Sequence, residues 1–158
     1  MEKETFKESL QHGTTAFPIA VYPMKFPKDQ QVLAHLHYHN EFELLVATKG
    51  HLLVQMETET YSLSAGEGLF INSGTLHTII SASPQEETGF IAVVFDYSIL
   101  CTEQDITYEN YIRPLLNGSL EPNILLSPDI CSLVHELFSA YEAKEFGYEL
   151  AVRYHLLQ

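Results

Sequence analysis

The chain has 158 residues, 46% hydrophobic and 18% charged, which is enough for one buried core and favours a single domain. Eight Lys and Arg against 21 Asp and Glu give a formal net charge of −13, so we expect this chain by itself to bind no nucleic acid. No apolar run approaches the roughly 20 residues that span a bilayer, and the charged start predicts no secretory signal. Two cysteines, Cys101 and Cys131, are too few for a disulfide framework and favour a reducing, cytoplasmic setting.

The first two thirds of the chain predict strands. Residues 1–16 are polar and aperiodic, which predicts a loose N-terminal arm. Residues 17–95 alternate short β-rich runs with turn residues such as Asn72-Ser73-Gly74. The predicted strands are 17–22, 32–37, 42–46, 52–56, 61–63, 68–71, 77–80 and 90–95. Short strands at this spacing are typical of a mainly antiparallel β-sandwich or barrel.

The last third, residues 96–158, begins with a mixed segment and then predicts two helices. Ser127-Pro128-Asp129 supplies an N-cap, a proline for the first helical position and an acid for the first turn. Apolar residues at helical spacing follow, and a second helical pattern runs from Tyr148 to Gln158. Gln158 ends that pattern without a stop signal. We therefore expect a chain cut from a longer protein, the alternative being a natural end at this point.

A cluster of histidines is the strongest chemical signal in the sequence. His37 and His39 share one face of a strand, because residues two apart project together. On a straight strand Glu43 would lie about 20 Å from His37. Glu43 can join them if the chain turns near Asn40-Glu41 and returns on a neighbouring strand. His77, at the start of another predicted strand, would complete a set of three imidazoles and one carboxylate.

Such a set suits two kinds of site. Imidazole and carboxylate ligands accommodate a divalent transition metal such as Zn, Ni, Fe or Mn, and four protein ligands leave open positions on a six-coordinate ion. Alternatively, the four groups line a wet pocket and form hydrogen bonds with one another or with an organic ligand. The residue types alone leave both open.

Two longer patterns resemble the cupin family. His37-x-His39-x3-Glu43-x6-Gly50 is similar to the first cupin motif, although Gln31 stands in place of its leading glycine. Gly66-x5-Asn72-x-Gly74-x2-His77 is similar to the second, with Asn72 in place of the usual proline and Ser81 in place of asparagine. The four positions that bind metal in metal-bearing cupins are intact. The three positions that differ from the cupin motifs are expected in turns, and none of them is a metal-ligand position.

A narrower resemblance is to the N-terminal sensor domain of AraC-family transcriptional regulators. The resemblance lies in the amino-acid sequence of residues 37–45, 61–72 and 93–96 and in the predicted helices that follow. It implies a cupin-type antiparallel β-barrel (a double-stranded β-helix, or jelly roll) over residues 17–95, followed by two C-terminal α-helices. It also implies a small effector, a sugar or another metabolite, bound in the barrel, and a homodimer formed through the helices. In some members of the family the N-terminal arm closes over the pocket, which is the alternative to a loose arm over residues 1–16. The family's DNA-binding helix-turn-helix domain is absent from these residues.

Further candidates for the binding site and the dimer contact are less distinctive. Tyr22, Tyr38, Phe70 and Asn72 are candidates for aromatic stacking or hydrogen bonding to the effector, the alternative being ordinary core or rim positions. Five residues of the helices are candidates for a dimer contact or for packing on the barrel: Phe138, Tyr141, Leu150, Tyr154 and Leu157.

The competing function is a free-standing, metal-dependent cupin enzyme, such as a dioxygenase or isomerase. The intact set of three histidines and a glutamate favours it, because an effector pocket does not need that set. Against it, no further titratable residue near the motifs stands out as a general acid or base. We therefore expect a sensor domain and not an enzyme.

Overall fold

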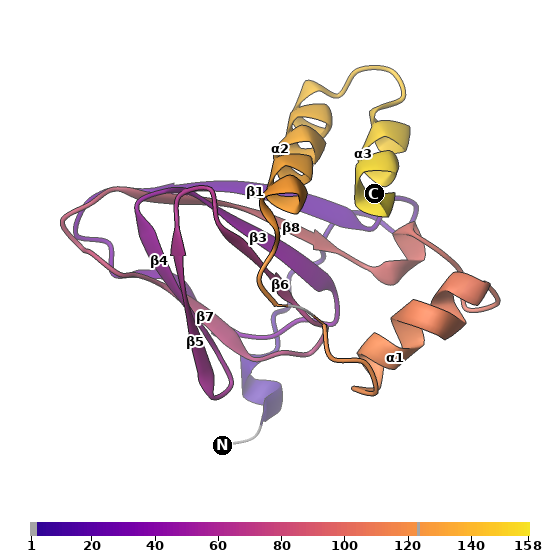
Figure 1. Cartoon of the computed structure of the whole chain (residues 1–158), viewed down its shortest axis with the longest axis horizontal. Coiled ribbons are helices and arrows are strands. Elements are labelled where there is room, and N and C mark those ends of the chain that lie inside the picture. The colour runs from indigo at the N-terminus through magenta and orange to yellow at the C-terminus, as the bar shows by residue number, and fades with distance from the viewer. Residues whose placement is uncertain (1–2, 123) are drawn as a thin grey trace.

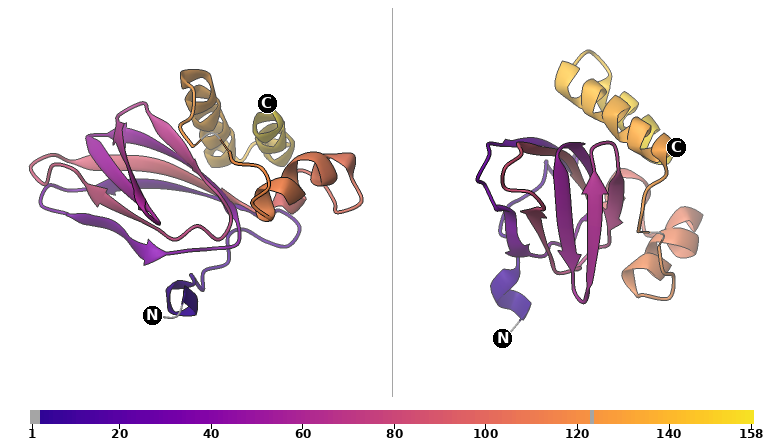
Figure 2. Two further views of the ribbon diagram at one scale, coloured as in Figure 1. Left: turned by 60° about the horizontal axis from the view of Figure 1, so that its bottom comes forward. Right: turned by 60° about the vertical axis from the view of Figure 1, so that its left-hand side comes forward.

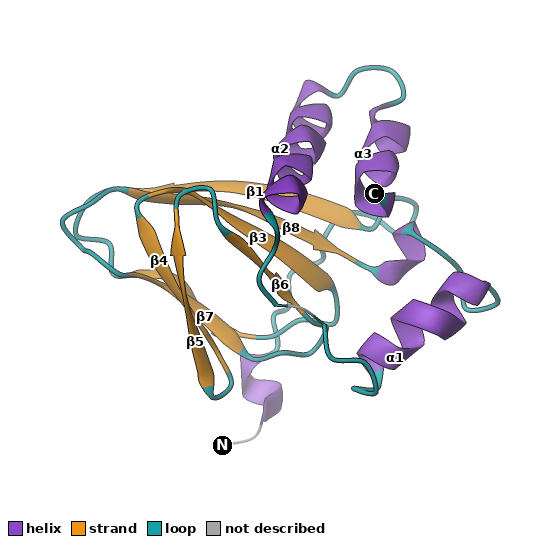
Figure 3. Ribbon diagram, in the orientation of Figure 1, coloured by secondary structure: helices purple, strands orange, loops and turns teal. Residues whose placement is uncertain are grey.

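The computed structural model describes residues 3–122 and 124–158, so the first two residues of the predicted arm lie outside it. The strands form two antiparallel four-stranded sheets that face each other (Figures 1 and 3). The first sheet has the order β1-β8-β3-β6, with β1 Ile19–Phe26, β8 Thr88–Phe95, β3 Phe42–Lys49 and β6 Gly68–Ile71. The second has the order β2-β7-β4-β5, with β2 Val32–His37, β7 His77–Ser81, β4 His51–Met56 and β5 Glu59–Ser64. The predicted fold class, a cupin-like antiparallel barrel, is confirmed.

Strand β1 is longer than the sequence predicted, because it continues through Pro23 to Phe26. Proline lacks the N–H that a central strand needs for pairing on both sides. Strand β1 lies at the edge of its sheet and pairs only with β8, where Pro23 stands opposite Ile91. The edge position therefore tolerates the proline.

Strand β8 separates two hydrophobic cores. All eight of its residues are buried, and successive side chains point to opposite faces of the sheet. Val93 and Phe95 pack into a core shared with the helices, whereas Phe90 and Ala92 pack into the core between the two sheets. A continuous apolar run is the pattern expected of a strand covered on both faces.

The C-terminal part contains the two predicted helices and several shorter ones. The long helices are α2, Pro128–Ala143, and α3, Tyr148–Leu157. The Ser127 side chain caps α2 by accepting a hydrogen bond from the Ile130 N–H, as the sequence predicted. The mixed segment before them forms η2 Tyr97–Ile99, the π-helix η3 Tyr108–Ile112 and the short α1 Arg113–Leu116. No helix among the described residues combines the length and apolar character needed to cross a bilayer.

Helices α2 and α3 lie together on one side of the barrel, over the first sheet (Figures 1 and 2). Val134, Leu137 and Val152 form the buried contact with that sheet, and Phe138 and Tyr141 pack partly buried beside them. Phe138 and Tyr141 therefore pack on the barrel, which is one of the two roles predicted for them. The remaining three candidates on α3 are exposed: Leu150, Tyr154 and Leu157.

The N-terminal arm lies on the opposite side of the barrel from these helices and includes the helical turn η1, Lys3–Phe6 (Figure 2). The Glu8 N–H donates to the carbonyl of Tyr38, and the Tyr38 N–H donates to the carbonyl of Phe6. Lys7 thereby forms a parallel β-bridge with Tyr38. The expectation of a loose arm is wrong, because hydrophobic periodicity does not reveal a segment held by backbone pairing to a distant part of the chain.

Candidate functional site

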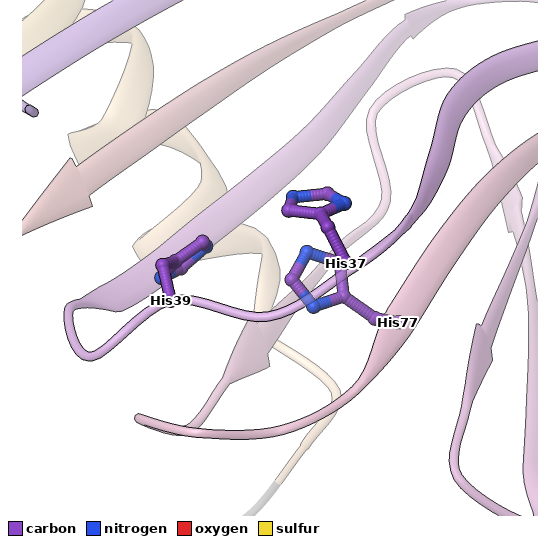
Figure 4. Close-up of side chains that lie close together, drawn as sticks. All are labelled: His37, His39 and His77. Carbon is purple, nitrogen blue, oxygen red and sulfur yellow. The ribbon is translucent and has the colours of Figure 1, made fainter. Parts of the chain in front are cut away.

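The histidine cluster begins with a cross-strand pair. His37 ends β2 and His77 begins β7, and the register of these two strands places them directly opposite each other. Their ring centroids are 4.2 Å apart (Figure 4). His77 is fully buried and His37 partly so. Two imidazoles far apart in sequence therefore share one end of the barrel.

His39 and Glu43 join this pair because the chain changes sheet between them. The turn after β2 carries His39, and Glu43 is the second residue of β3, which belongs to the facing sheet. The Gly74 N–H donates to the carbonyl of His39, which fixes the turn against the loop before β7. The predicted turn is present, but the expectation that Glu43 returns on a neighbouring strand is wrong, since it returns on the opposite sheet. Glu43 Oε2 lies 3.0 Å from His39 Nε2 and 3.4 Å from His77 Nε2.

The three imidazole rings are held in one orientation by the backbone. Nδ1 of His37 lies 2.6 Å from the carbonyl oxygen of His35, and Nδ1 of His39 lies 3.1 Å from that of Glu41. Nδ1 of His77 lies 2.9 Å from the carbonyl oxygen of Thr75. A carbonyl only accepts, so Nδ1 carries the proton whenever a ring is neutral, and Nε2 is left with a free lone pair. One ligating nitrogen from each ring lies within 4.8 Å of the others.

The charges at the site are set by burial and by these contacts. Burial disfavours the Glu43 carboxylate, but the adjoining His39 and His77 rings outweigh it and hold the pKa of Glu43 well below its ordinary value. Burial also opposes the charged form of His39, yet Glu43 beside it raises the pKa of His39 above the ordinary value. Burial and the adjacent His77 ring lower the pKa of His37. Glu43 is therefore an ionised acceptor at neutral pH.

A cavity of about 190 Å³ extends from this cluster between the two sheets. Its walls are largely apolar, and Tyr22 projects into it from β1. The residues that line it are Glu8, Leu10, His12, Tyr22, Met24, Leu33, Ala34, His37, His39, Glu43, Ile79, Phe90, Ala92 and Val94. Of the four additional residues considered for the pocket, Tyr22 is the one in this lining.

The other three lie elsewhere. Phe70 lines a separate apolar groove between the first sheet and helix α2, because its position in β6 faces the outside of the barrel. The Asn72 amide donates to the carbonyl of Leu115 and so connects the barrel to α1. Tyr38 pairs with the arm through its backbone. The structure thus does not bring Phe70 or Asn72 into the cavity.

Two residues of the arm, missed from the sequence, lie at the cluster. His12 is buried, its Nδ1 lies 2.8 Å from the Tyr22 hydroxyl, and its ring centroid is 5.5 Å from that of His39. Glu8 Oε2 lies 3.1 Å from His12 Nε2 and 3.9 Å from His37 Nε2. Burial and the Glu8 charge raise the pKa of the Tyr22 hydroxyl. Titratable groups from outside the motifs therefore lie at the cluster, whereas the prediction from the sequence concerned a general acid or base only near the motifs. The only signal for this in the sequence is that His12 is followed directly by Gly13, and such a pair is too common to indicate a binding site.

Two facing antiparallel sheets around a histidine-lined cavity define a cupin-type ligand-binding barrel. The model of the AraC-like ligand binding domain matches residues 22–158, and the chain belongs to that family.

The chain is also similar to individual proteins. The chain is 28% identical over 124 residues to the uncharacterized HTH-type transcriptional regulator YdeC of Bacillus subtilis (strain 168), which is 78% of this chain and 42% of the relative. It therefore spans less than half the length of that regulator. Among solved structures, a cupin protein from Bacteroides fragilis has a TM-score of 0.46 and 21% identity, over 53% of this chain and 70% of that one. A predicted oxalate decarboxylase from Thermotoga maritima has a TM-score of 0.43 and 26% identity, over 48% and 64%. The matched family is one of ligand-binding domains, and the relative is described as an HTH-type transcriptional regulator.

Proposed function

We propose that this domain senses a small, oxygen-rich metabolite in the cavity between its sheets, with a divalent metal ion as part of the binding site. The orientation of the three imidazoles carries the proposal. Each Nδ1 is engaged by a backbone carbonyl, so the three Nε2 atoms are the ones that would bind an ion, and Nε2 of His39 would exchange its hydrogen bond to Glu43 for coordination. Fixing the tautomer through the second nitrogen is typical of metal-ligating histidines.

The donor set fits a metal on a second ground. Nε2 of His77 is buried and has no hydrogen-bond partner among the described residues. An unsatisfied buried polar atom costs about 1–3 kcal/mol. Coordination would satisfy it, and imidazole with carboxylate suits Zn, Ni, Fe or Mn. The chemistry that a bound ion supplies here is open coordination positions for oxygen atoms of an effector.

The cavity limits the size of that effector. Pockets for drug-sized ligands measure about 300–1,000 Å³, whereas this one measures about 190 Å³. A sugar or a short organic acid suits the combination of a polar end and apolar walls. The Tyr22 hydroxyl and the metal ligands would recognise the oxygen atoms, and Met24 and Phe90 would contact the carbon skeleton.

Metal content tests the proposed site. Protein purified without an affinity tag and equilibrated with Zn²⁺ should retain about one ion per chain, measured by elemental mass spectrometry. His77→Ala should lose it, because Nε2 is then gone. His51→Ala is the matched control, since His51 is exposed on β4 and has no part in the cluster. A wild-type chain without bound zinc, or equal retention in His77→Ala, contradicts the site.

The proposal extends to a homodimer formed through α3. Leu150, Tyr154 and Leu157 occur at helical spacing and are 71%, 61% and 65% exposed. Contiguous exposed apolar surface of this kind marks interaction sites. Leu150→Glu should shift the chain towards monomer in sedimentation velocity. Ile106→Glu, at a similarly exposed apolar residue away from α3, should leave the distribution unchanged. Equal behaviour of the two variants contradicts the interface.

In the whole protein, we propose, effector binding favours one arrangement of arm, barrel and helices over another. An attached DNA-binding domain, which we place outside these residues by analogy with the HTH-type regulator, would respond to that change in the cytoplasm. The shift can be no larger than the effector's differential affinity for the two states. Binding of promoter DNA by the full-length protein, with and without effector, tests this step.

One observation favours the enzyme as second candidate. Glu8, His12 and Tyr22 place three titratable groups at the edge of the cluster, where general acid–base chemistry would need them. Mass spectrometry of a bound effector after incubation with the metal-loaded chain separates the two functions. An unchanged effector supports sensing, and conversion to product supports catalysis.

A further inference from the structure

The arm reaches the site by a fixed path. Its backbone pairs with Tyr38, between two of the proposed metal ligands, and it turns towards β1 at Gly13. Gly13 has φ of +76°, and a Cβ there would lie 2.5 Å from backbone atoms of Phe17 and Ile19. Only glycine fits such a conformation in so little space. The sequence thus holds the arm in one place at both ends of the stretch that covers the cavity.

Within this stretch, a chain of hydrogen bonds orients the Glu8 carboxylate. The Tyr22 hydroxyl contacts Nδ1 of buried His12, and Nε2 of His12 contacts Glu8 Oε2. Glu8 itself is 28% exposed, so it lies at the boundary between solvent and cavity. Its Oε2 faces His37 from the side of the arm, while Glu43 contacts His39 and His77 from β3.

We infer that Glu8 is an additional ligand of the metal ion, supplied by the arm, and that His12 and Tyr22 are positioning residues for it. The inference rests on the metal site proposed above. In the structure Oε2 makes the contact with His12 and also faces His37, so the carboxylate would have to rotate for one oxygen to coordinate while the other keeps the contact with His12. The metal site is then shared between barrel and arm.

The distance between Glu8 and His37 is compatible with their binding the same ion. First-row ions bind nitrogen and oxygen ligands at about 2.0–2.2 Å, so two ligands of one ion lie at most about 4.4 Å apart. Glu8 Oε2 is 3.9 Å from His37 Nε2, within this limit. The donor atoms that lie within 4.8 Å of one another belong to the three histidines, so the Glu8 side chain would have to turn further towards His39 and His77 to coordinate the same ion. Charge agrees as well, because two carboxylates with three neutral imidazoles balance a divalent cation. A buried ion is favourable only when its charge is compensated in this way.

The consequence is that the metal fixes the arm. Because the Glu8 N–H is bonded to the carbonyl of Tyr38, coordination of the Glu8 side chain would stabilise this pairing directly. Amide exchange at Glu8 and at Tyr38 should therefore slow when the site is filled.

Zn²⁺ affinity, measured by competition with a chromophoric chelator, tests the inference. Glu8→Gln keeps the size of the side chain and should bind Zn²⁺ about tenfold more weakly or worse. Glu142→Gln, on the exposed surface of α2, makes the same change in net charge and should bind like wild type. Zn²⁺ should slow hydrogen–deuterium exchange at the Glu8 and Tyr38 amides about tenfold in the wild type and leave it unchanged in Glu8→Gln.

His77→Ala separates this inference from the proposed site. If the wild type binds Zn²⁺ and His77→Ala does not, the site stands. In that case, equal affinities of Glu8→Gln and Glu142→Gln, or arm exchange indifferent to Zn²⁺, would overturn the role of Glu8 alone. A wild type that binds no Zn²⁺ overturns both.

Discussion

Glu43→Gln tests the centre of the site, because it removes one charge and changes the size of the side chain very little. Glu43 is 4% exposed and lies 3.0 Å from His39 Nε2. In the metal-free chain a charge-assisted hydrogen bond, worth about 1.5–3 kcal/mol, becomes a neutral one worth about 0.5–1.5 kcal/mol. The free energy of unfolding should fall by about 1–1.5 kcal/mol, which lowers Tm by about 2–6 °C in a chain of this length.

Metal should enlarge this difference. At a Zn²⁺ concentration 100 times the wild-type Kd, binding stabilises the folded wild type by about 2.7 kcal/mol. If loss of the Glu43 charge weakens binding about 10–100-fold, the variant gains only about 1.4 to 0.4 kcal/mol at the same concentration. The gap between the two proteins should therefore grow to about 2–4 kcal/mol.

Urea unfolding followed by circular dichroism, with and without Zn²⁺, measures both quantities. Glu142→Gln controls for the change in net charge and should behave as wild type does in both conditions. If Glu43→Gln gained as much stability from Zn²⁺ as wild type, Glu43 would not be a ligand. A variant as stable as wild type without metal would contradict the charged contact with His39.

Three further outcomes follow from the geometry. In NMR titration of the metal-free chain, His39 should titrate above about 6.5 and His37 below it, because Glu43 favours the charged form of the first while burial and His77 disfavour that of the second. The stabilisation due to His39 is then complete below about pH 6.5 and is lost as pH rises through the higher pKa of His39 in the folded chain. If His37 titrated above His39, the contacts of His39 with Glu43 and of His37 with His77 would be contradicted. Gly13→Ala should speed amide exchange across the arm about tenfold or more, since its Cβ has no room, and unchanged exchange would show that the arm is placed otherwise. Leu137→Ala, at a fully buried position of α2, should lower the free energy of unfolding by about 2–5 kcal/mol in urea denaturation, and a loss under about 1 kcal/mol would mean that α2 packs loosely.

The sequence by itself determined the elements and the members of the central cluster. Short apolar runs between turn residues predicted the strands, and Ser127 with Pro128 predicted the start of α2, because hydrophobic period and capping are local properties. The spacing of His37, His39, Glu43 and His77 was sufficient to select these four, since it is carried by motifs of the chain itself.

Only the tertiary structure decided on which face of the barrel, inside or outside, each of these side chains lies. Glu43 reaches the histidines from the facing sheet, Phe70 faces the helices instead of the cavity, and Glu8 and His12 enter from an arm without apolar periodicity. These placements depend on where the chain crosses between sheets and on backbone pairing between segments distant in sequence. A periodic pattern identifies a buried face of a strand, but it does not say which other segment covers that face.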